Sequence, residues 1–190
     1  METSKKILAL DSSGLVASVA VVEGNSTYSN LLAEYTVNYK KTHSQTLLPM
    51  LDEIANMTEL DLTTIDAIAI AAGPGSFTGL RIGSATAKGL GLALKKPLIS
   101  IPTVDALAYN LYGTDRLICP IMDARRNQVY TGIYEFRGNT MEVLEPQMAV
   151  DIEVIAEKLC ERQQDVIFLG DGVPVFKDKL CNGLMAKLHD

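Results

Sequence analysis

Residues 65–94 read IDAIAIAAGPGSFTGLRIGSATAKGLGLAL, and this stretch decides the fold. Its first part, Ile65–Ala71, is a short apolar run that predicts a buried strand. The glycines and proline of Gly73–Gly75 end that strand, and the segment from about Thr78 to Leu94 is predicted to be a helix. A strand that passes through a glycine-rich turn into a helix indicates a βα unit of an α/β protein.

The segments on either side of this βα unit complete the first half of the chain. Three strands are predicted before it, joined by tight polar turns, so the sheet should begin antiparallel. A helix follows that begins at a Thr42 N-cap, contains Pro49 and runs to about Met57. The other predicted elements are the strands Ile7–Leu10, Val16–Val22, Leu31–Asn38 and Leu98–Ile101, and a helix from Pro102 or Thr103 to near Gly113.

The same order of elements starts again near residue 117. The predicted elements are the strands Leu117–Met122, Val129–Phe136 and Met141–Leu144, a helix capped by Asp151 that ends at Cys160, the strand Val166–Leu169 and the helix Val175–Leu184. The repeat predicts two α/β lobes, residues 1–115 and 116–190, with mixed sheets, helices on both faces and a cleft between the lobes. The second half lacks a final strand and helix, so we expect a second lobe that is shortened by truncation.

The composition is that of an ordinary globular protein, with 47% hydrophobic and 21% charged residues. The 17 basic and 23 acidic side chains give a net charge of −6 that is spread over both halves, which argues against a free-standing nucleic-acid binder. Three scattered cysteines fit a reducing compartment. Because no signal peptide or membrane-spanning stretch is evident, we expect a soluble cytoplasmic protein.

Two polar turns, Asp11–Gly14 and Asp123–Arg126, occupy the same place in the two halves. Small residues in the first turn let backbone amides approach an anion, whereas the arginines of the second suit that role badly. The loop Gly73–Arg81 matches no Walker A loop, dinucleotide loop or nucleophile elbow, but it leads into a helix N-terminus. Plain structural turns are the alternative. The candidate nucleotide or anion site consists of Asp11, Ser12, Ser13, Gly73, Gly75, Ser76 and Asp123.

Two helices carry unusual surfaces. Small residues recur every fourth position at Gly79, Gly83, Ala87 and Gly91, and these four form a nearly side-chain-free ridge. Such a ridge indicates close approach of another backbone, from either the chain's own sheet or a second subunit. The earlier helix has an apolar face wide enough to meet more than its own core; its residues are Leu47, Met50, Leu51, Ile54, Ala55 and Met57.

Catalytic residue types are scarce. His43 and His189 are the only histidines, and no pair of histidines at helical spacing suggests a zinc site. A Ser-His-Asp triad would have to use His43 without further support. We therefore predict no catalytic residue, no metal and no cofactor.

Several motifs together resemble a known family. They are Ile7–Ser13 (ILALDSS), His43–Gln45 with Leu47–Met50, Gly73–Arg81 (GPGSFTGLR), and Asp123–Arg125 with Val129–Tyr130. In this order, over residues 6 to about 136, they look like the TsaB (YeaZ) family of bacterial tRNA threonylcarbamoyladenosine synthesis. The nine-residue Gly73–Arg81 block is the most specific of them.

The resemblance implies an actin-like fold of the sugar-kinase type and a non-catalytic scaffold subunit. Its partners would be a TsaD-like paralogue, which carries the metal and modifies tRNA beside the anticodon, and a TsaE-like ATPase. Alone it would form a homodimer, and it would reach tRNA only through the complex. TsaD-type proteins carry two histidines four residues apart on the first long helix. Here the residue four positions after His43 is Leu47. The implied partner contacts lie on the first two long helices: His43, Leu47, Met50, Leu51, Ile54, Gly79, Ile82, Gly83, Ala87 and Gly91.

Other functions stay open beside this one. The runner-up is an ATP-binding enzyme or ATPase of the same fold, in which Asp11 and Asp123 would share a magnesium ion. A third is an unrelated small-molecule-binding lobe. The wider family also carries the label glycoprotease-like peptidase, but this sequence shows neither a nucleophile constellation nor a metal-ligand pair to support it.

Overall fold

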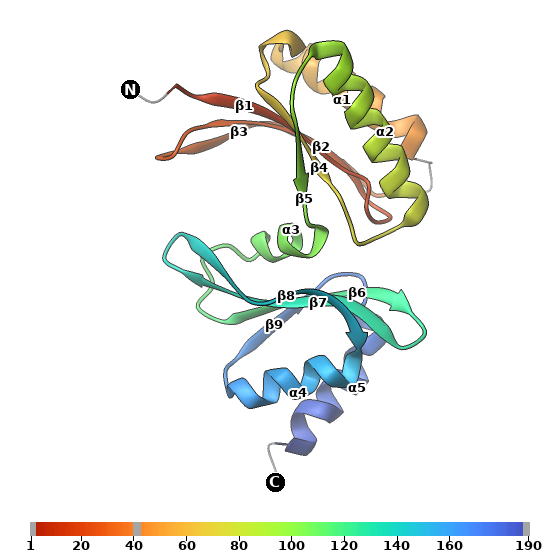
Figure 1. The fold of residues 1–190 in the computed structure, drawn as a ribbon, viewed down its shortest axis with the longest axis vertical. Coiled ribbons are helices and arrows are strands. Elements are labelled where there is room, and N and C mark those ends of the chain that lie inside the picture. Colours follow the sequence, from red (N-terminus) through yellow and green to blue (C-terminus); the bar gives the residue numbers. More distant parts are fainter. Residues whose placement is uncertain (1–2, 40–42, 188–190) are drawn as a thin grey trace. The chain divides into compact units, whose positions relative to one another are not determined.

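The computed structural model describes residues 3–39 and 43–187, so the predicted N-cap at Thr42 and His189 lie outside the described residues. The chain divides into two compact units, Met1–Thr103 and Val104–Asp190 (Figure 1). We expected a division near residue 115; the contacts group all of the helix α3 (Thr103–Tyr109) except its first residue with the second unit.

The first unit is built on a five-stranded mixed sheet of order β3-β2-β1-β4-β5. The strand β1 pairs antiparallel with β2 and parallel with β4, so the sheet begins as a meander and continues with βα units. The elements are β1 (Lys5–Asp11), β2 (Ala17–Gly24), β3 (Ser29–Val37), α1 (His43–Thr58), the 3₁₀ turn η1 (Leu62–Thr64), β4 (Ala67–Ala71), α2 (Phe77–Leu94) and β5 (Leu98–Ile101).

Both long helices of this unit cover the same face of the sheet. The buried residues of α1 and Ala87 of α2 share one core cluster with Leu8, Val19 and Ile70 of the sheet. The expectation of helices on both faces is therefore wrong for α1 and α2. The reason is topological: the chain moves from β1 to β4 and on to β5 in one direction, and right-handed crossovers in one direction place their helices on one face.

The second unit repeats the plan with a four-stranded sheet of order β8-β7-β6-β9. One face packs against α4 and α5, and the other packs against Val104 and Ala108 of α3. The elements are β6 (Leu117–Arg125), β7 (Gln128–Arg137), β8 (Thr140–Asp151), α4 (Ile152–Arg162), β9 (Val166–Leu169) and α5 (Val173–Lys187). The predicted α/β fold class, with a duplicated order of elements and mixed sheets, is confirmed.

One local prediction in the second unit is wrong, and another holds only in part. The strand β8 does not end before Pro146 but continues to Asp151, because β8 is an edge strand and its pairing with β7 shifts register beside that proline. Asp151 occupies the N-cap position of α4, but its side chain makes no capping hydrogen bond.

Candidate interaction site on the first unit

The small-residue ridge of α2 lies against the chain's own sheet. A methyl group on Gly79 or Gly83 would overlap Ser12 at the end of β1, and on Gly91 it would lie 2.9 Å from Leu98 Cδ2 of β5. Ala87 in the same row is fully buried. Of the two alternatives for the ridge, packing against the chain's own sheet is the one that the structure shows, so these four positions present no free surface.

Most of the predicted apolar face of α1 also belongs to the core, whereas Met57 is 78% exposed. The residues Leu47, Met50, Leu51 and Ile54 are between 1% and 4% exposed. Ile82 of α2 is partly buried and packs against the same cluster. These predicted contact residues therefore pack between the two helices and the sheet and fix the position of the helices.

Other residues of α1 and α2 form the surface that points outward. Leu92 is 83% exposed and Leu48 is 52% exposed, and Ala85 and Gly89 are exposed as well. A methyl group on Gly89 would meet no atom of the described part of the chain within 4 Å. We call Leu48, Ala85, Gly89 and Leu92 the outer face. The sequence prediction missed it, although Ala85, Gly89 and Leu92 are spaced by four and three residues, as one side of a helix requires.

The turn after β1 and the loop before α2 are joined to each other. The Asp11 carboxylate accepts from the Ser13 amide at 2.7 Å, and the Ser13 carbonyl accepts from the Ser76 amide at 2.6 Å. The Ser12 hydroxyl donates to the Gly79 carbonyl at 2.9 Å. A Cβ on Gly75 would overlap Ser13, so only glycine fits there.

Much of the hydrogen-bonding capacity of this candidate anion loop is already used. The amide of Gly73 donates to Thr103 Oγ1, and the amide of Gly79 donates to Ser76 Oγ, which caps α2. Six of the seven predicted loop residues come together here, while Asp123 lies in the second unit. The arrangement holds the first unit's βα connection to the end of β1.

His43 begins α1 and fastens it to the same turn. Its Nε2 lies 2.8 Å from the Gly14 carbonyl oxygen. Since a carbonyl only accepts, this ring nitrogen carries the proton and donates. Leu47, one helical turn further on, is 1% exposed in the core. Among residues 3–39 and 43–187, no group of three histidine, cysteine, aspartate or glutamate side chains could hold a metal ion.

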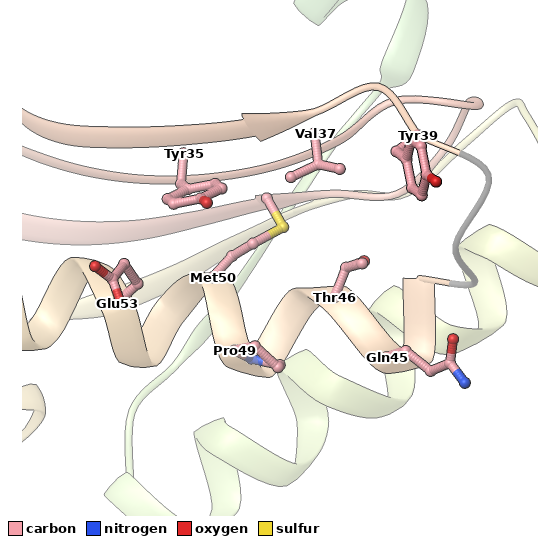
Figure 2. Close-up of a pocket in the computed structure, with 8 residues that line it drawn as sticks. All are labelled: Tyr35, Val37, Tyr39, Gln45, Thr46, Pro49, Met50 and Glu53. Carbon is pink, nitrogen blue, oxygen red and sulfur yellow. The ribbon is translucent and has the colours of Figure 1, made fainter.

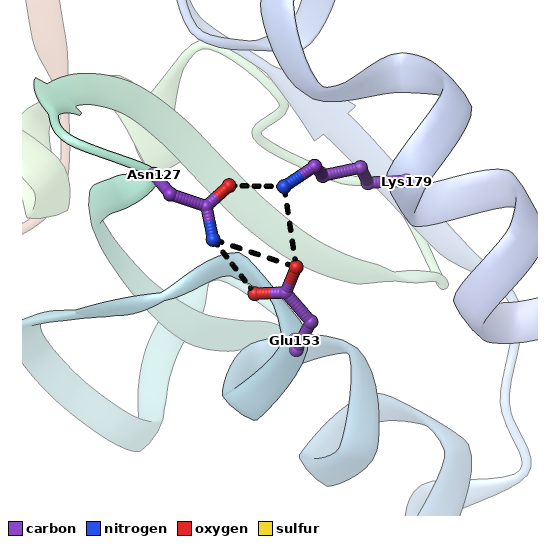
Figure 3. A network of polar contacts seen from close by, with 3 residues as sticks. All are labelled: Asn127, Glu153 and Lys179. Carbon is purple, nitrogen blue, oxygen red and sulfur yellow. Dashed lines mark hydrogen bonds and ion pairs between the residues drawn. The ribbon is translucent and has the colours of Figure 1, made fainter.

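The matching turn of the second unit is braced in a different way. Asp123 Oδ1 accepts from the Arg125 amide at 2.8 Å, which repeats the Asp11–Ser13 bond of the first unit. Beyond it, Arg125, Arg126 and Asn127 all have positive φ angles, a conformation that costs most residues energy. The Asn127 side chain bonds to Glu153 of α4 and to Lys179 of α5 (Figure 3).

The charges of this network stabilise one another. The pKa of Glu153 is lowered because its carboxylate accepts from its own backbone amide and from Lys179 and Asn127. Lys179 and Glu153 are 3.3 Å apart as an ion pair. The network ties the hairpin tip to both helices through Asn127, a non-glycine residue with a positive φ angle.

Two strongly perturbed groups lie in the core of the second unit. Burial raises the pKa of the Cys119 thiol to about 12. Burial, together with the hydrogen bond to Asp105, also raises the pKa of the Tyr134 hydroxyl. Both groups therefore remain protonated at neutral pH and serve packing.

Comparison with known proteins identifies the family. A family model described as TsaD, tRNA N6-adenosine threonylcarbamoyltransferase, matches residues 30–189. The tRNA threonylcarbamoyladenosine biosynthesis protein TsaB of Bacillus subtilis (strain 168) is 34% identical over 181 residues, which are 95% of this chain and 77% of that protein. The chain belongs to the TsaB (YeaZ) family.

Further TsaB relatives agree in sequence and in structure. The protein named TsaB from Haemophilus influenzae is 34% identical over 84% of this chain and 66% of its own length. The solved structure of YeaZ from Pseudomonas aeruginosa is 29% identical, has a TM-score of 0.66, and is matched over 78% of this chain and 68% of its own. The family predicted from the motifs is thus confirmed. None of the helices in the described part of the chain is both long and apolar enough to cross a membrane.

Proposed function

We propose that this chain is a non-catalytic scaffold subunit of tRNA threonylcarbamoyladenosine biosynthesis, and that it binds a TsaD-type chain through the outer face of α1 and α2. The observation that carries the proposal is the exposure of Leu48 and Leu92 on that face in a TsaB-family chain. Large exposed apolar side chains beside small ones are typical of a surface that another helix covers.

Gly89 gives this surface a second argument. A glycine inside a helix destabilises it by about 1 kcal/mol relative to alanine. At Gly79 and Gly83 the close approach of Ser12 explains the glycine, whereas a Cβ on Gly89 would have no atom of the described residues within 4 Å. A partner helix that packs against Gly89 would explain why no side chain is present there.

The match to the TsaD family model supports a TsaD-type protein as the partner. A TsaD family model matches residues 30–189 of this chain, so a TsaD-type protein should present a similar pair of helices. Two similar helix pairs can pack as a pseudo-symmetric four-helix contact, and two copies of this chain could use the same face as a homodimer. We extend the proposal to a TsaE-like ATPase as a further partner and to a cytoplasmic complex that supplies the tRNA contact.

The non-catalytic part of the proposal rests on α1. The histidine pair that the TsaD-type resemblance implies would occupy positions 43 and 47. Here His43 donates its Nε2 proton to Gly14, and Leu47 is buried in the core. This helix therefore supports the fold of the first unit where the paralogue would bind its metal.

The test is size-exclusion chromatography with light scattering, with the chain alone and mixed with the purified TsaD-type protein of the same organism. The wild-type chain should form a one-to-one complex. Leu92→Glu should weaken it at least tenfold, because a carboxylate would be buried among apolar groups. Leu15→Glu is the matched control, since Leu15 is also 83% exposed but lies in the turn after β1.

The outcomes separate the parts of the proposal. A chain that never forms a complex with the TsaD-type protein contradicts the scaffold role. A complex that Leu92→Glu leaves intact contradicts the outer face as the contact surface while keeping the partner. Loss of the complex with Leu92→Glu but not with Leu15→Glu supports both.

A further inference from the structure

A groove of about 390 Å³ lies on the other side of α1, between this helix and the edge strand β3 (Figure 2). Its floor is Met50, which is 4% exposed, and two aromatic rings rise above it: Tyr35 is 42% exposed and Tyr39 is 68% exposed. Glu53 lies at the Tyr35 end of the groove. The lining residues are Tyr35, Val37 and Tyr39 from the strand side, and Gln45, Thr46, Pro49, Met50 and Glu53 from the helix.

The groove offers acceptors and aromatic faces. The Glu53 carboxylate makes no hydrogen bond or ion pair with any residue that the structure describes. Pro49 has no N–H to donate to the carbonyl of Gln45. The Gln45 carbonyl is therefore a second acceptor in the groove that lacks its usual helical donor. No lysine or arginine occurs among the described lining residues.

These features favour a cation as the occupant. A carboxylate attracts an ammonium or guanidinium group, and the face of a tyrosine ring adds a cation–π attraction. The long stem of a basic side chain would cover Met50 while its charged head reaches Glu53. A phosphate-bearing ligand would instead meet the Glu53 carboxylate, which has no partner among the described residues, on a chain of net charge −6.

The strand β3 supplies the means to hold a chain segment. It is the outermost strand of its sheet and pairs only with β2 among the described strands, so the backbone groups of its other edge are free for a further strand. Residues paired across two strands project to the same face of a sheet. A residue paired with Tyr35 or Val37 would therefore project its side chain on the face that borders the groove.

We infer that an extended segment of a partner protein adds to the free edge of β3 and places a lysine or arginine side chain in the groove between Tyr35, Tyr39 and Glu53. This site is separate from the outer face, because it uses the β3 side of α1. It therefore does not depend on the proposed scaffold function.

The experiment measures binding of a labelled peptide by fluorescence anisotropy. The peptide has seven residues, alternating threonine and valine around one central arginine, and its partner peptide carries the uncharged isostere citrulline instead. The full chain should bind the arginine peptide about fivefold more tightly than the citrulline peptide. Glu53→Gln should remove this difference, because an exposed ion pair of this kind is worth a few-fold in affinity.

Two further variants complete the design. Tyr35→Ala should weaken the arginine peptide several-fold by removing a ring face. Glu34→Gln is the matched control: it removes one negative charge from the same strand, but Glu34 pairs in register with Ala20 and faces the opposite side of the sheet from Tyr35. It should leave both peptides unaffected.

Three results would overturn the inference. They are equal binding of the two peptides, no binding of either at millimolar concentration, and equal effects of Glu34→Gln and Glu53→Gln. Adenosine monophosphate is the competing probe: if it binds and Tyr35→Ala abolishes its binding while the arginine peptide does not bind, the groove takes a nucleobase instead of a basic side chain.

Discussion

Two glycines of the same helix should respond in opposite ways to the same substitution. A methyl group added at Gly89 meets no atom within 4 Å in residues 3–39 and 43–187, so Gly89→Ala should gain the full helix propensity of alanine, about 1 kcal/mol of unfolding free energy. A methyl group added at Gly79 would lie well under 3 Å from the Ser12 carbonyl oxygen and 3.3 Å from His43 Cδ2.

The cost at Gly79 follows from what must move. The Ser12 oxygen is backbone and cannot rotate away, so α2 would have to shift from the end of β1, which costs about 1–3 kcal/mol as overpacking. The shift would also stretch the buried 2.9 Å hydrogen bond from Ser12 Oγ to the Gly79 carbonyl, worth about 1 kcal/mol. After the propensity gain is subtracted, Gly79→Ala should lower the unfolding free energy by about 1–3 kcal/mol.

Urea unfolding followed by circular dichroism measures both variants. With a slope of roughly 2 kcal/mol per molar, the midpoint should rise by about 0.5 M for Gly89→Ala and fall by about 0.5–1.5 M for Gly79→Ala. Unchanged slopes would show that only stability has changed. If Gly79→Ala were as stable as the wild-type chain, the ridge could not pack against Ser12, and the division of α2 into an inner and an outer face would be refuted.

Three further outcomes are expected. Burial raises the pKa of Cys119 to about 12. A thiol reagent at pH 8 should therefore label the exposed Cys181 of the folded chain within minutes, and Cys119 only after denaturation. Labelling of both cysteines at one rate would contradict the burial of Cys119. The hydrogen bond from Lys158, followed by that from Arg162, lowers the pKa of Glu145, so this contribution to stability is present above the unfolded pKa of about 4.3 and is lost as the pH falls through the lower folded value. Glu145→Gln should therefore cost about 1 kcal/mol at pH 7 and nothing at pH 2, measured by thermal unfolding at each pH; an equal cost at both would exclude the carboxylate as the cause. Calorimetric titration with Mg-ATP should show weak binding or none, because the amides of Ser13 and Ser76 already donate within the chain. Tight binding that Asp11→Asn abolishes would favour the ATP-binding alternative.

Local patterns in the sequence were sufficient for most of the fold. The strands Leu98–Ile101 and Val166–Leu169 begin and end where their apolar runs do, because a short parallel strand next to a turn has few alternatives. The end of β8 could not be read in this way. Pro146 stops a strand in the middle of a sheet, and only the sheet order shows that β8 is an edge strand where a proline is tolerated.

The site was less accessible to sequence reasoning for a physical reason. A row of glycines indicates that something approaches a helix closely, but the row itself does not say whether Ser12 or a partner does so. The groove of Figure 2 depends on Tyr35 and Glu53, which come from different elements and meet only through the packing of α1 on β3. The Asp11 turn, by contrast, was found because its residues are contiguous in the sequence and its Asp11–Ser13 hydrogen bond is local.

The sheet order of the first unit also affects how the chain emerges from the ribosome. The central strand β1 finds β2 at once, but its other edge waits for β4, whose Ala67 pairs with Ile7. At roughly 5–20 residues per second, synthesis of the intervening segment takes about 3–12 seconds. During that time an apolar strand edge is open to other nascent chains, so the early hairpin is a stage at which chaperones should protect this protein from aggregation.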